Sequence, residues 1–429
     1  MRTLFFIISL SLISFSCKKD NNFQNSATSL PTITTIGATS ITSTTALTGG
    51  NVGNDGGGTV TARGVCWANS SNPTITGSHT LDGNGIGTFN SNITGLTPTA
   101  NYYIRAFATN SIGTAYGNEV IITTPVSDVY VAGIEYSGLY TVAMVWKNGV
   151  ATSLTNGLTD AFASTVLVSG SDVYIVGEEN NGTNKVAKVW KNGIATSLTD
   201  GLHNASAESI FISGTDIYIV GYESNGIKDV AKIWKNGVPN SLTNGLDDAG
   251  ARSVYVSGND VYVAGIAYTT GLKYPTIWKN GVATALSPFG YYGDANSVYV
   301  SGTDVYVAGA QIASSGTNKI IELWKNGIPT ALSNGSHPGW GQSVYVSGTD
   351  IYVAGGDYQG MIWKNGVTTF LGSTQSFAED VFVLGSDVYV VGEERFNITT
   401  TVATIWKNGV LTFLTNGANT SQAFSVYVK

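Results

Sequence analysis

The segment SVYVSGTDVYVAG, residues 297–309, decides the fold, because the chain repeats it with small changes along most of its length. Its two halves, SVYVSG and DVYVAG, are rich in valine and tyrosine and flank the pair Gly302-Thr303. Runs of β-branched and aromatic residues around a two-residue loop that begins with glycine are typical of a β-hairpin. The segment therefore predicts two antiparallel strands joined by a tight turn.

A fixed word, WKNG, accompanies the hairpin and sets the period of the repeat. Its seven tryptophans are Trp146, Trp190, Trp234, Trp278, Trp324, Trp363 and Trp406. Successive copies are 44, 44, 44, 46, 39 and 43 residues apart, a period typical of β-propeller blades. An apolar run ends at each tryptophan, and the Asn-Gly pair turns the chain into a further run such as VATALS. Each copy thus predicts a four-stranded antiparallel sheet.

The two ends of the repeat array predict how it terminates. The array starts at Asp128 with DVYVAG and lacks the preceding SVYVSG run, whereas the chain finishes with FSVYVK. The last run can pair with the first and so leave no exposed sheet edge. The runs are almost continuously apolar, which requires cover on both faces, and radial packing of sheets provides it. We therefore expect an all-β protein in which residues 126–429 form a seven-bladed β-propeller closed by the C-terminal strand.

The array resembles β-propeller repeats in general. It lacks the Gly-His and Trp-Asp pairs of WD40 blades and the double glycine of kelch blades, so the resemblance assigns no subfamily.

Residues 31–124 are divided by Gly, Asn and Pro into short β-rich runs at the spacing of a β-sandwich. The stretch LTPTANYYIRAFATNSIG, which starts at Leu96, resembles the fibronectin type III signature, in which a tyrosine hydroxyl ties a corner between the sheets to upstream backbone. The resemblance implies that Tyr102 is this tyrosine. The family's usual second-strand tryptophan is missing, and Trp67 lies in the expected third strand. We interpret this domain as a spacer.

The N-terminus reads as an export signal. Arg2 precedes an apolar run that is too short to span a membrane, and Cys17 follows that run directly. This order resembles the lipobox of bacterial lipoproteins, which implies a signal peptide over residues 1–17, lipidation of Cys17 and a polar tether over residues 18–30. We expect an outer-membrane or cell-surface lipoprotein of a Gram-negative bacterium, held in the membrane by its lipid anchor. A secreted protein with a plain cleaved signal is the alternative.

Composition excludes several classes of function. The formal net charge is −7, and the 21 basic residues form no cluster, so we expect no nucleic-acid partner. Beyond Cys17 the chain has a single cysteine, Cys66, which we interpret as a small buried apolar residue. The histidines are scattered, and the sequence shows neither zinc-ligand spacing nor a nucleophile motif. We therefore expect no metal, no cofactor and no catalytic residues.

Residues that recur in every copy are interpreted as structural. An aspartate and a lysine stand beside the tight turns of each copy, as Asp304 and Lys325 do, which indicates turn chemistry and solubility. Residues that break the repeat are more informative, because blade packing does not require them. Two connectors between copies read SPFGYYGDA and SNGSHPGWG, where another reads TNGLDDAGA. We expect these connectors to lie near the mouth of the propeller's central channel. Their candidate ligand-binding residues are Phe289, Tyr291, Tyr292, Asp294, His337 and Trp340.

Aromatic rings beside a few polar groups can stack on a sugar ring or bind an extended peptide. The alternative is that these residues are local sequence variation among diverging repeats, without a role in binding. We expect a non-catalytic, monomeric, envelope-anchored binding or scaffold protein that presents a propeller face to a glycan, peptide or protein. The alternative is a propeller-type polysaccharide lyase or glycoside hydrolase that uses carboxylates at the channel mouth. The candidates for that role are Asp160, Asp247, Asp248 and Asp294.

Overall fold

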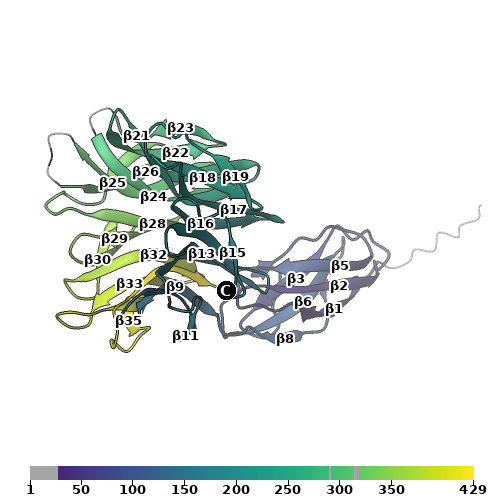
Figure 1. Ribbon diagram of the computed structural model, residues 1–429. Coiled ribbons are helices and arrows are strands. Elements are labelled where there is room, and N and C mark those ends of the chain that lie inside the picture. Colours follow the sequence, from purple (N-terminus) through teal and green to yellow (C-terminus); the bar gives the residue numbers. More distant parts are fainter. Residues whose placement is uncertain (1–27, 289–290, 314–315, 317) are drawn as a thin grey trace, which may run out of the picture. The chain divides into compact units, whose positions relative to one another are not determined.

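The computed structural model describes residues 28–288, 291–313, 316 and 318–429 (Figure 1). Within these residues the secondary structure is β-strand, as the sequence predicts, and no helix is present that could cross a membrane. The chain divides between Pro125 and Val126 into two compact units. The predicted signal peptide with Cys17, and most of the predicted tether, lie outside the described residues.

The first unit contains two antiparallel sheets. One sheet consists of β1 (Thr32–Thr39), β2 (Ala46–Asn54) and β5 (Gly87–Ile93), and the other of β3 (Ala62–Ala68), β4 (Ser78–His79), β6 (Asn101–Thr109), β7 (Thr114–Tyr116) and β8 (Val120–Thr123). Apolar side chains from both sheets form one core, with Val52 and Ile93 from the first and Val65 and Ile104 from the second. The unit is held together by this shared core, because the described part contains no disulfide.

Two residues singled out in the sequence lie in this unit. Tyr102 is buried, and its hydroxyl accepts a hydrogen bond of 3.0 Å from the backbone N–H of Thr97. Cys66 is also buried, and burial raises the pKa of its thiol to about 11. At neutral pH this side chain is therefore an uncharged and poorly nucleophilic thiol.

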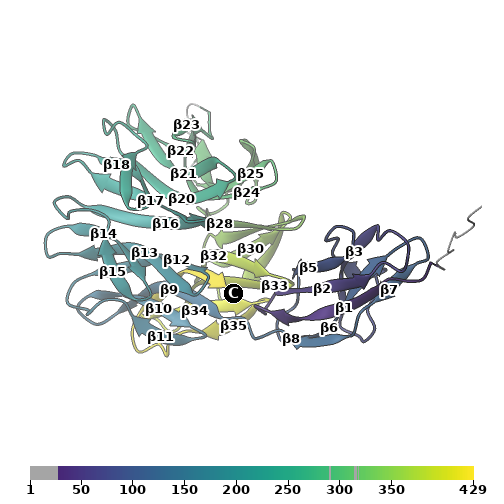
Figure 2. The same cartoon turned by 90° about the vertical axis from the view of Figure 1, so that its right-hand side faces the viewer.

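The second unit contains seven four-stranded antiparallel sheets in the part of the chain that is described (Figure 2). The first sheet consists of β9 (Val129–Tyr136), β10 (Thr141–Lys147), β11 (Val150–Ser153) and β36 (Ser421–Val428). The second to fourth sheets consist of β12 (Ala161–Ser169), β13 (Asp172–Asn180), β14 (Lys185–Lys191) and β15 (Ile194–Ser197); β16 (Ala205–Ser213), β17 (Asp216–Ser224), β18 (Asp229–Lys235) and β19 (Val238–Ser241); and β20 (Ala249–Ser257), β21 (Asp260–Thr269), β22 (Leu272–Lys279) and β23 (Val282–Ala285). The fifth to seventh consist of β24 (Tyr291–Ser301), β25 (Asp304–Ala313), β26 (Ile320–Lys325) and β27 (Ile328–Ala331); β28 (Trp340–Ser347), β29 (Asp350–Gly356), β30 (Gly360–Lys364) and β31 (Val367–Leu371); and β32 (Ser376–Leu384), β33 (Asp387–Arg395), β34 (Thr401–Lys407) and β35 (Val410–Phe413).

The first sheet takes one of its strands from the other end of the chain. β36 pairs antiparallel with β9, so that Val426 lies opposite Val131 and Val428 opposite Val129. Backbone bonds of 2.9 and 3.0 Å between Asp128 and Lys429 extend this ladder. The C-terminal run thus occupies the place of the SVYVSG run that the first repeat lacks.

Turn chemistry explains the two tight turns of each repeat. In the SGTD turn Ser301 lies opposite Asp304, and Gly302 has a φ of 61°, as the first loop position of a type II′ turn requires. In the KNG turn Asn148 and Gly149 both have positive φ, 51° and 80°, as a type I′ turn requires. Both turns were predicted from the sequence as hairpins.

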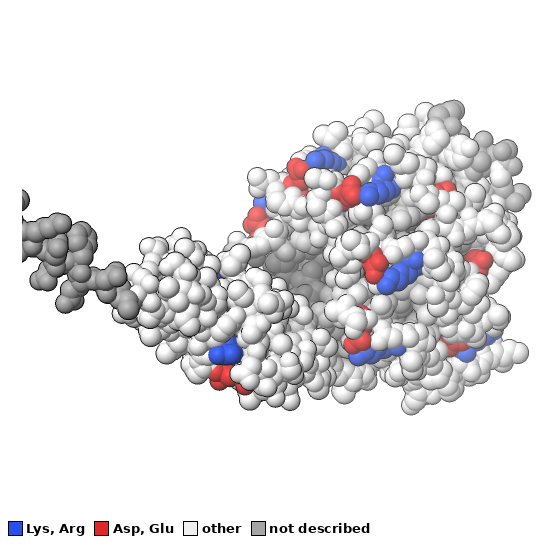
Figure 3. All heavy atoms as spheres, turned by 180° about the vertical axis from the view of Figure 1, so that it is seen from behind, with Lys and Arg blue, Asp and Glu red and all other residues white. Residues whose placement is uncertain are grey.

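The aspartate and lysine beside these turns pair with each other. Lys325 lies 2.7 Å from Asp304, and the Asn326 side chain donates a 2.8 Å hydrogen bond to the same carboxylate. The same two contacts recur in all seven sheets. Figure 3 shows such adjoining positive and negative groups on the surface of the second unit. These residues therefore fasten turns and neutralise each other.

Neighbouring sheets share apolar clusters built around the repeated tryptophans, which are at most 1% exposed. Trp278 of β22, for example, packs in one cluster with Val220 of β17. Trp146 of the first sheet packs in the same way with Val391 and Ala403 of the last sheet. Burial of such large side chains supplies roughly 2 to 3 kcal/mol each.

The outermost strand of each sheet is short and exposed. These strands have four residues, or five in β31, and each carries one solvent-exposed valine or isoleucine directly after the KNG turn, such as Val150 and Ile194. Two of them contain a proline, Pro239 in β19 and Pro329 in β27.

A matched pair of substitutions tests the pairing of β36. Val428 is 2% exposed on β36, whereas Val410 is 69% exposed on β35. We expect Val428→Asp to lower the free energy of unfolding by about 4 kcal/mol, because it buries an unpaired charge, and Val410→Asp to change it by less than about 0.5 kcal/mol. Urea unfolding of the second unit measures both. Equal unfolding midpoints for the two variants would contradict the pairing.

Candidate ligand-binding site

One strand of each sheet carries a β-bulge at the same place. We call these seven strands the inner strands: β12, β16, β20, β24, β28, β32 and β36. In β20, for example, Ala251 and Ser253 have consecutive partners on β21, and Arg252 between them has none. The residues left unpaired in this way, the bulge positions, are Ser164, Glu208, Arg252, Asn296, Gln342, Glu379 and Phe424. A bulge redirects a side chain without ending the strand.

All seven bulge positions line one cavity of about 880 Å³. The residue that follows each bulge position lines it too. The following residue is a serine or threonine in six strands and Asp380 in the seventh, whereas the bulge positions hold six different residue types. The sequence is thus nearly constant at the position after the bulge and variable at the bulge position itself.

The uniform residue after each bulge ties neighbouring inner strands together. In β24 the Ser297 hydroxyl accepts a 3.1 Å hydrogen bond from the backbone N–H of Val344 in β28. Asp380 serves two neighbours, since it accepts from the Ser343 hydroxyl at 2.6 Å and from the Val426 N–H at 2.9 Å. Corresponding bonds join β12 to β16, β16 to β20, β20 to β24 and β36 to β12. The uniform position is therefore structural.

A second uniform position lies two residues further along each inner strand. Six of its seven residues are aromatic: Phe211, Tyr255, Tyr299, Tyr345, Phe382 and Tyr427. Consecutive rings in this aromatic belt have centroids 4.7 to 5.1 Å apart in tilted contacts, a favourable arrangement for aromatic pairs. Burial raises the pKa of Tyr345 to about 12, so this hydroxyl stays protonated at neutral pH. The belt therefore fixes the packing of neighbouring inner strands.

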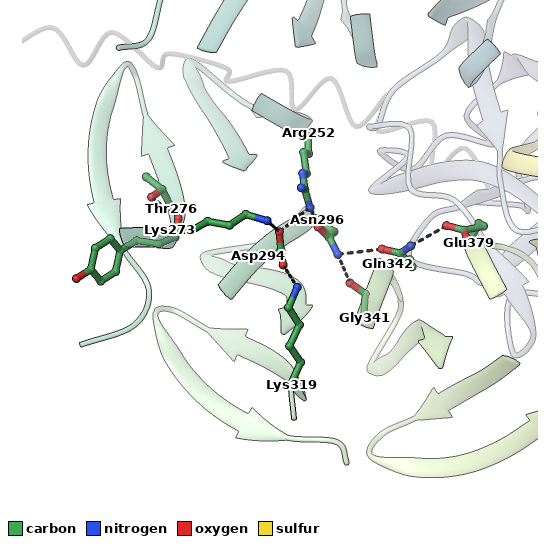
Figure 4. Close-up of polar contacts among 10 residues, drawn as sticks. Arg252, Lys273, Thr276, Asp294, Asn296, Lys319, Gly341, Gln342 and Glu379 are labelled. Atoms are coloured by element: carbon green, nitrogen blue, oxygen red, sulfur yellow. Dashed lines mark hydrogen bonds and ion pairs between the residues drawn. The ribbon is translucent and has the colours of Figure 1, made fainter. Parts of the chain in front are cut away.

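Three cations converge on one buried carboxylate at the start of β24 (Figure 4). Arg252 lies 3.1 Å from Oδ1 of Asp294, Lys273 contacts the same oxygen, and Lys319 lies 2.5 Å from Oδ2. Burial alone would raise the pKa of Asp294, but the charge of Arg252 and hydrogen bonds from the two lysines outweigh it and hold this pKa at about 2. We call these four residues the cation cluster.

A chain of polar contacts runs from this cluster across the inner strands (Figure 4). Arg252 donates to the side-chain oxygen of Asn296, and the Asn296 amide donates 2.9 Å bonds to Gly341 O and Gln342 Oε1. Gln342 donates in turn to Glu379 Oε2 at 2.8 Å. Four consecutive bulge positions are thus oriented by one another, so their side chains are held in place before any ligand binds.

Acidic side chains accumulate elsewhere along the cavity wall. Burial, together with the charge of Glu393, raises the pKa of Glu379 to about 7. Burial also raises the pKa of Glu208 and of Asp380. Of the cation cluster, Arg252 lines the cavity, whereas near β32 and β16 the wall is acidic or protonated.

The structure brings two of the six sequence-predicted residues together. Trp340, 36% exposed at the start of β28, lies under Lys319, whose Nζ is 5.2 Å from the ring centroid. Lys319 also binds Asp294, so Trp340 borders the cation cluster. Asp294 itself is 1% exposed, with both carboxylate oxygens engaged. It therefore orients cations and is not placed to contact a ligand.

Three of the other predicted residues have neighbours outside this contact. Tyr291 and Tyr292 begin β24 opposite Ala313 and Ile312. His337 lies 3.5 Å from Asp357 in a different loop and packs edge-on against Tyr358. Phe289 lies outside the described residues.

The carboxylates proposed for the enzymatic alternative have structural contacts. Asp160 accepts a 2.8 Å bond from the Thr141 N–H, and Asp248 accepts one of 3.0 Å from the Asp229 N–H and pairs with Lys228. Asp247 is its half-buried neighbour. The described residues contain no group of three His, Cys, Asp or Glu side chains suited to a metal ion.

Sequence reasoning missed the bulge positions and the lysines of the cation cluster. The bulge residues stand directly before the serine of SVYVSG, so the variation among aligned repeats carries a usable signal. Lys273 and Lys319 stand at the same place in two repeats, five residues before the tryptophan of WKNG, but that place holds Thr141, Asp229 and Tyr358 in other repeats, so it is not a recurring feature of the pattern.

Comparisons with known proteins add little to this description. No family model matches the chain, and no curated protein matches it. Among solved structures it is similar to TolB from Acinetobacter baumannii, at 10% identity and a TM-score of 0.38, over 59% of this chain and 73% of that one. It is also similar to a DUF4784 family protein from Bacteroides caccae, at 12% identity and a TM-score of 0.30, over 78% and 94%. The function therefore has to be inferred from the residues of the chain itself.

The raised pKa of Glu379 predicts a pH-dependent effect on stability. The folded state keeps this carboxyl protonated up to about pH 7, whereas the unfolded state releases the proton near pH 4.3. The carboxyl therefore destabilises the fold progressively as pH rises through that window. We expect Glu379→Gln to gain stability relative to the native chain between pH 5 and pH 8, measured by urea unfolding. Asp294→Asn is the control, since the lowered pKa of Asp294 predicts a constant difference over this range. A constant difference for Glu379→Gln would contradict the prediction.

Proposed function

We propose that the chain is a non-catalytic, envelope-anchored binding protein. A fibronectin type III-like sandwich would carry a closed seven-bladed β-propeller, and the ligand would bind where the bulge positions meet solvent. Three lines of support, on the fold, the anchor and the site, are independent of one another.

The fold proposal is supported by strand pairing and by the cavity. β36 joins the first sheet, neighbouring sheets share apolar clusters that include the last and the first, and residues of seven inner strands line one cavity. For the sandwich, the support is the pair of sheets with one core and the bond from Thr97 to the Tyr102 hydroxyl, the contact expected of the tyrosine corner.

The anchor proposal rests on the sequence. An apolar run followed by Cys17 supports export and lipidation, and hence an outer-membrane or cell-surface location. Several acyl chains at Cys17 would hold the protein firmly, because each buried CH₂ contributes about 0.8 kcal/mol.

Substitution of the cysteine tests the anchor. In a Gram-negative host we expect Cys17→Ser to abolish incorporation of labelled fatty acid and to move the protein from the membrane fraction to the soluble one. Cys66→Ser serves as the control, because Cys66 is buried and should remain unlabelled in the native chain. Unchanged labelling of Cys17→Ser would disprove the anchor.

The binding proposal is carried by one observation, the contrast between uniform and variable positions on the same strands. The residues that hold the inner strands together are nearly identical in all repeats, whereas the adjoining bulge positions hold six residue types. Four of these side chains, those of Arg252, Asn296, Gln342 and Glu379, are oriented by one chain of hydrogen bonds. Preorganised donors and acceptors in a cavity of about 880 Å³ are the usual make-up of a binding site.

One observation favours the enzymatic alternative, a polysaccharide lyase or glycoside hydrolase. The pKa of Glu379 is raised to about 7, which suits a general acid. Of the carboxylates proposed from the sequence, only Asp248 lines the cavity, so this alternative depends on Asp248 and Glu379.

A glycan and peptide array probed with residues 28–429 tests the binding proposal. We expect saturable binding that Gln342→Ala weakens by about tenfold or more, because it removes two contacts of the polar chain. Asn240→Ala, on the exposed outer strand β19, should bind as the native chain does. Equal binding by both variants would contradict the site. Turnover of an array polysaccharide that disappears in Glu379→Gln would instead establish the enzyme.

A further inference from the structure

The cation cluster carries more positive charge than its own carboxylate neutralises. Arg252, Lys273 and Lys319 surround the single negative charge of Asp294, which leaves a formal surplus of two positive charges. The surplus stands out in a chain whose net charge is −7. Burial, reinforced by the two neighbouring cations, lowers the pKa of Lys273 in spite of its contact with Asp294. One further anion would therefore relieve repulsion at this point.

The cations remain partly accessible although their carboxylate is buried. The exposed fractions of the side chains are 36% for Arg252, 28% for Lys273 and 26% for Lys319, against 2% for Asp294. Each ammonium has three N–H donors and the guanidinium has five, more than the two oxygens of Asp294 can accept. The accessible donors can thus bind a second carboxylate without displacing the first.

The neighbouring aromatic residue indicates which kind of anion fits. Lys319 lies over the ring of Trp340, which is 36% exposed. An exposed indole beside fixed hydrogen-bond donors can stack on the C–H face of a pyranose ring. Inorganic anions have no such face. Asn296 and Gln342, held in the adjoining polar chain, supply further groups that can bond with hydroxyls.

We propose that the cation cluster and Trp340 form a subsite for the carboxylate of an acidic saccharide, a uronic-acid unit of a polysaccharide. This inference rests on the proposed binding function and specifies its ligand class. The Lys319 ammonium binds the uronate carboxylate, while the ring of that sugar lies against the indole. Asp294 keeps the three cations together when the subsite is empty.

Titration calorimetry with defined oligosaccharides tests the subsite. The probes are an oligogalacturonate, its fully methyl-esterified form of equal length, and an oligoglutamate peptide. We expect the oligogalacturonate to bind at least about tenfold more tightly than its ester, and its affinity to fall as salt rises, because the cations are partly exposed.

Substitutions of lysine test whether the cation cluster binds the carboxylate of the oligogalacturonate. We expect Lys319→Gln to weaken binding of the oligogalacturonate by about tenfold and Lys319→Arg, which keeps the charge, to restore most of it. Lys325→Gln is the matched control, because it removes the same charge from a lysine that is 50% exposed and pairs with Asp304 beside a tight turn. This substitution should leave the affinity unchanged. Thermal unfolding of each variant shows that it is folded.

Several results would overturn the inference. Equal affinity for the acid and the ester, equal effects of Lys319→Gln and Lys325→Gln, or no binding of oligogalacturonate would exclude the anionic subsite. The array and Gln342→Ala would still decide the proposed binding function independently. If oligoglutamate bound as tightly as the oligogalacturonate, the site would recognise the carboxylate without any contribution from the sugar ring. This result would exclude a saccharide subsite.

Discussion

The pairing of β36 with β9 is the constraint on which the second unit depends. Without β36 the first sheet would lack its inner strand, and Val131 and Trp146 would lose part of the cluster that they share with the last sheet. β36 also supplies Ser425 and Val426, which are bonded to the inner strands on either side. About 290 residues separate the two paired strands in the sequence, so closure of a long loop opposes the pairing entropically. Many cooperative contacts between sheets have to offset this cost.

Each repeat places uniform structural positions directly beside a variable one. Turns are fastened by an aspartate, a lysine and an asparagine in every sheet, and inner strands by a hydroxyl and an aromatic ring. Against this uniform frame, the bulge lets one side chain per strand vary without disturbing the ladder on either side. Arg252, Asn296, Gln342 and Glu379 use that freedom to build a chain of contacts that no single repeat contains.

Much of the fold could be predicted from the sequence because it follows from local rules. Asn-Gly and Gly-Thr pairs determine turns, and apolar runs of regular period determine strands, so the repeated four-stranded sheets were predicted correctly. The candidate site was less accessible. Asp294 and Trp340 were singled out because they break the repeat, but the buried position of Asp294 depends on Arg252 and Lys273 of the fourth sheet and on Lys319, which directly precedes β26 of the fifth. Such convergence is a property of the folded sheets, and periodicity alone does not reveal it.

The short outermost strands bear on how readily two copies of this protein can pair edge to edge. A sheet margin offers unsatisfied peptide groups to any similar margin, and the second unit exposes several. Each margin is only four or five residues long, so two copies could form no more than a few intermolecular bonds there. Pro239 and Pro329 remove donors from two of them. The short edges and the two prolines therefore limit edge-to-edge pairing, although the repeat places several similar edges in one molecule.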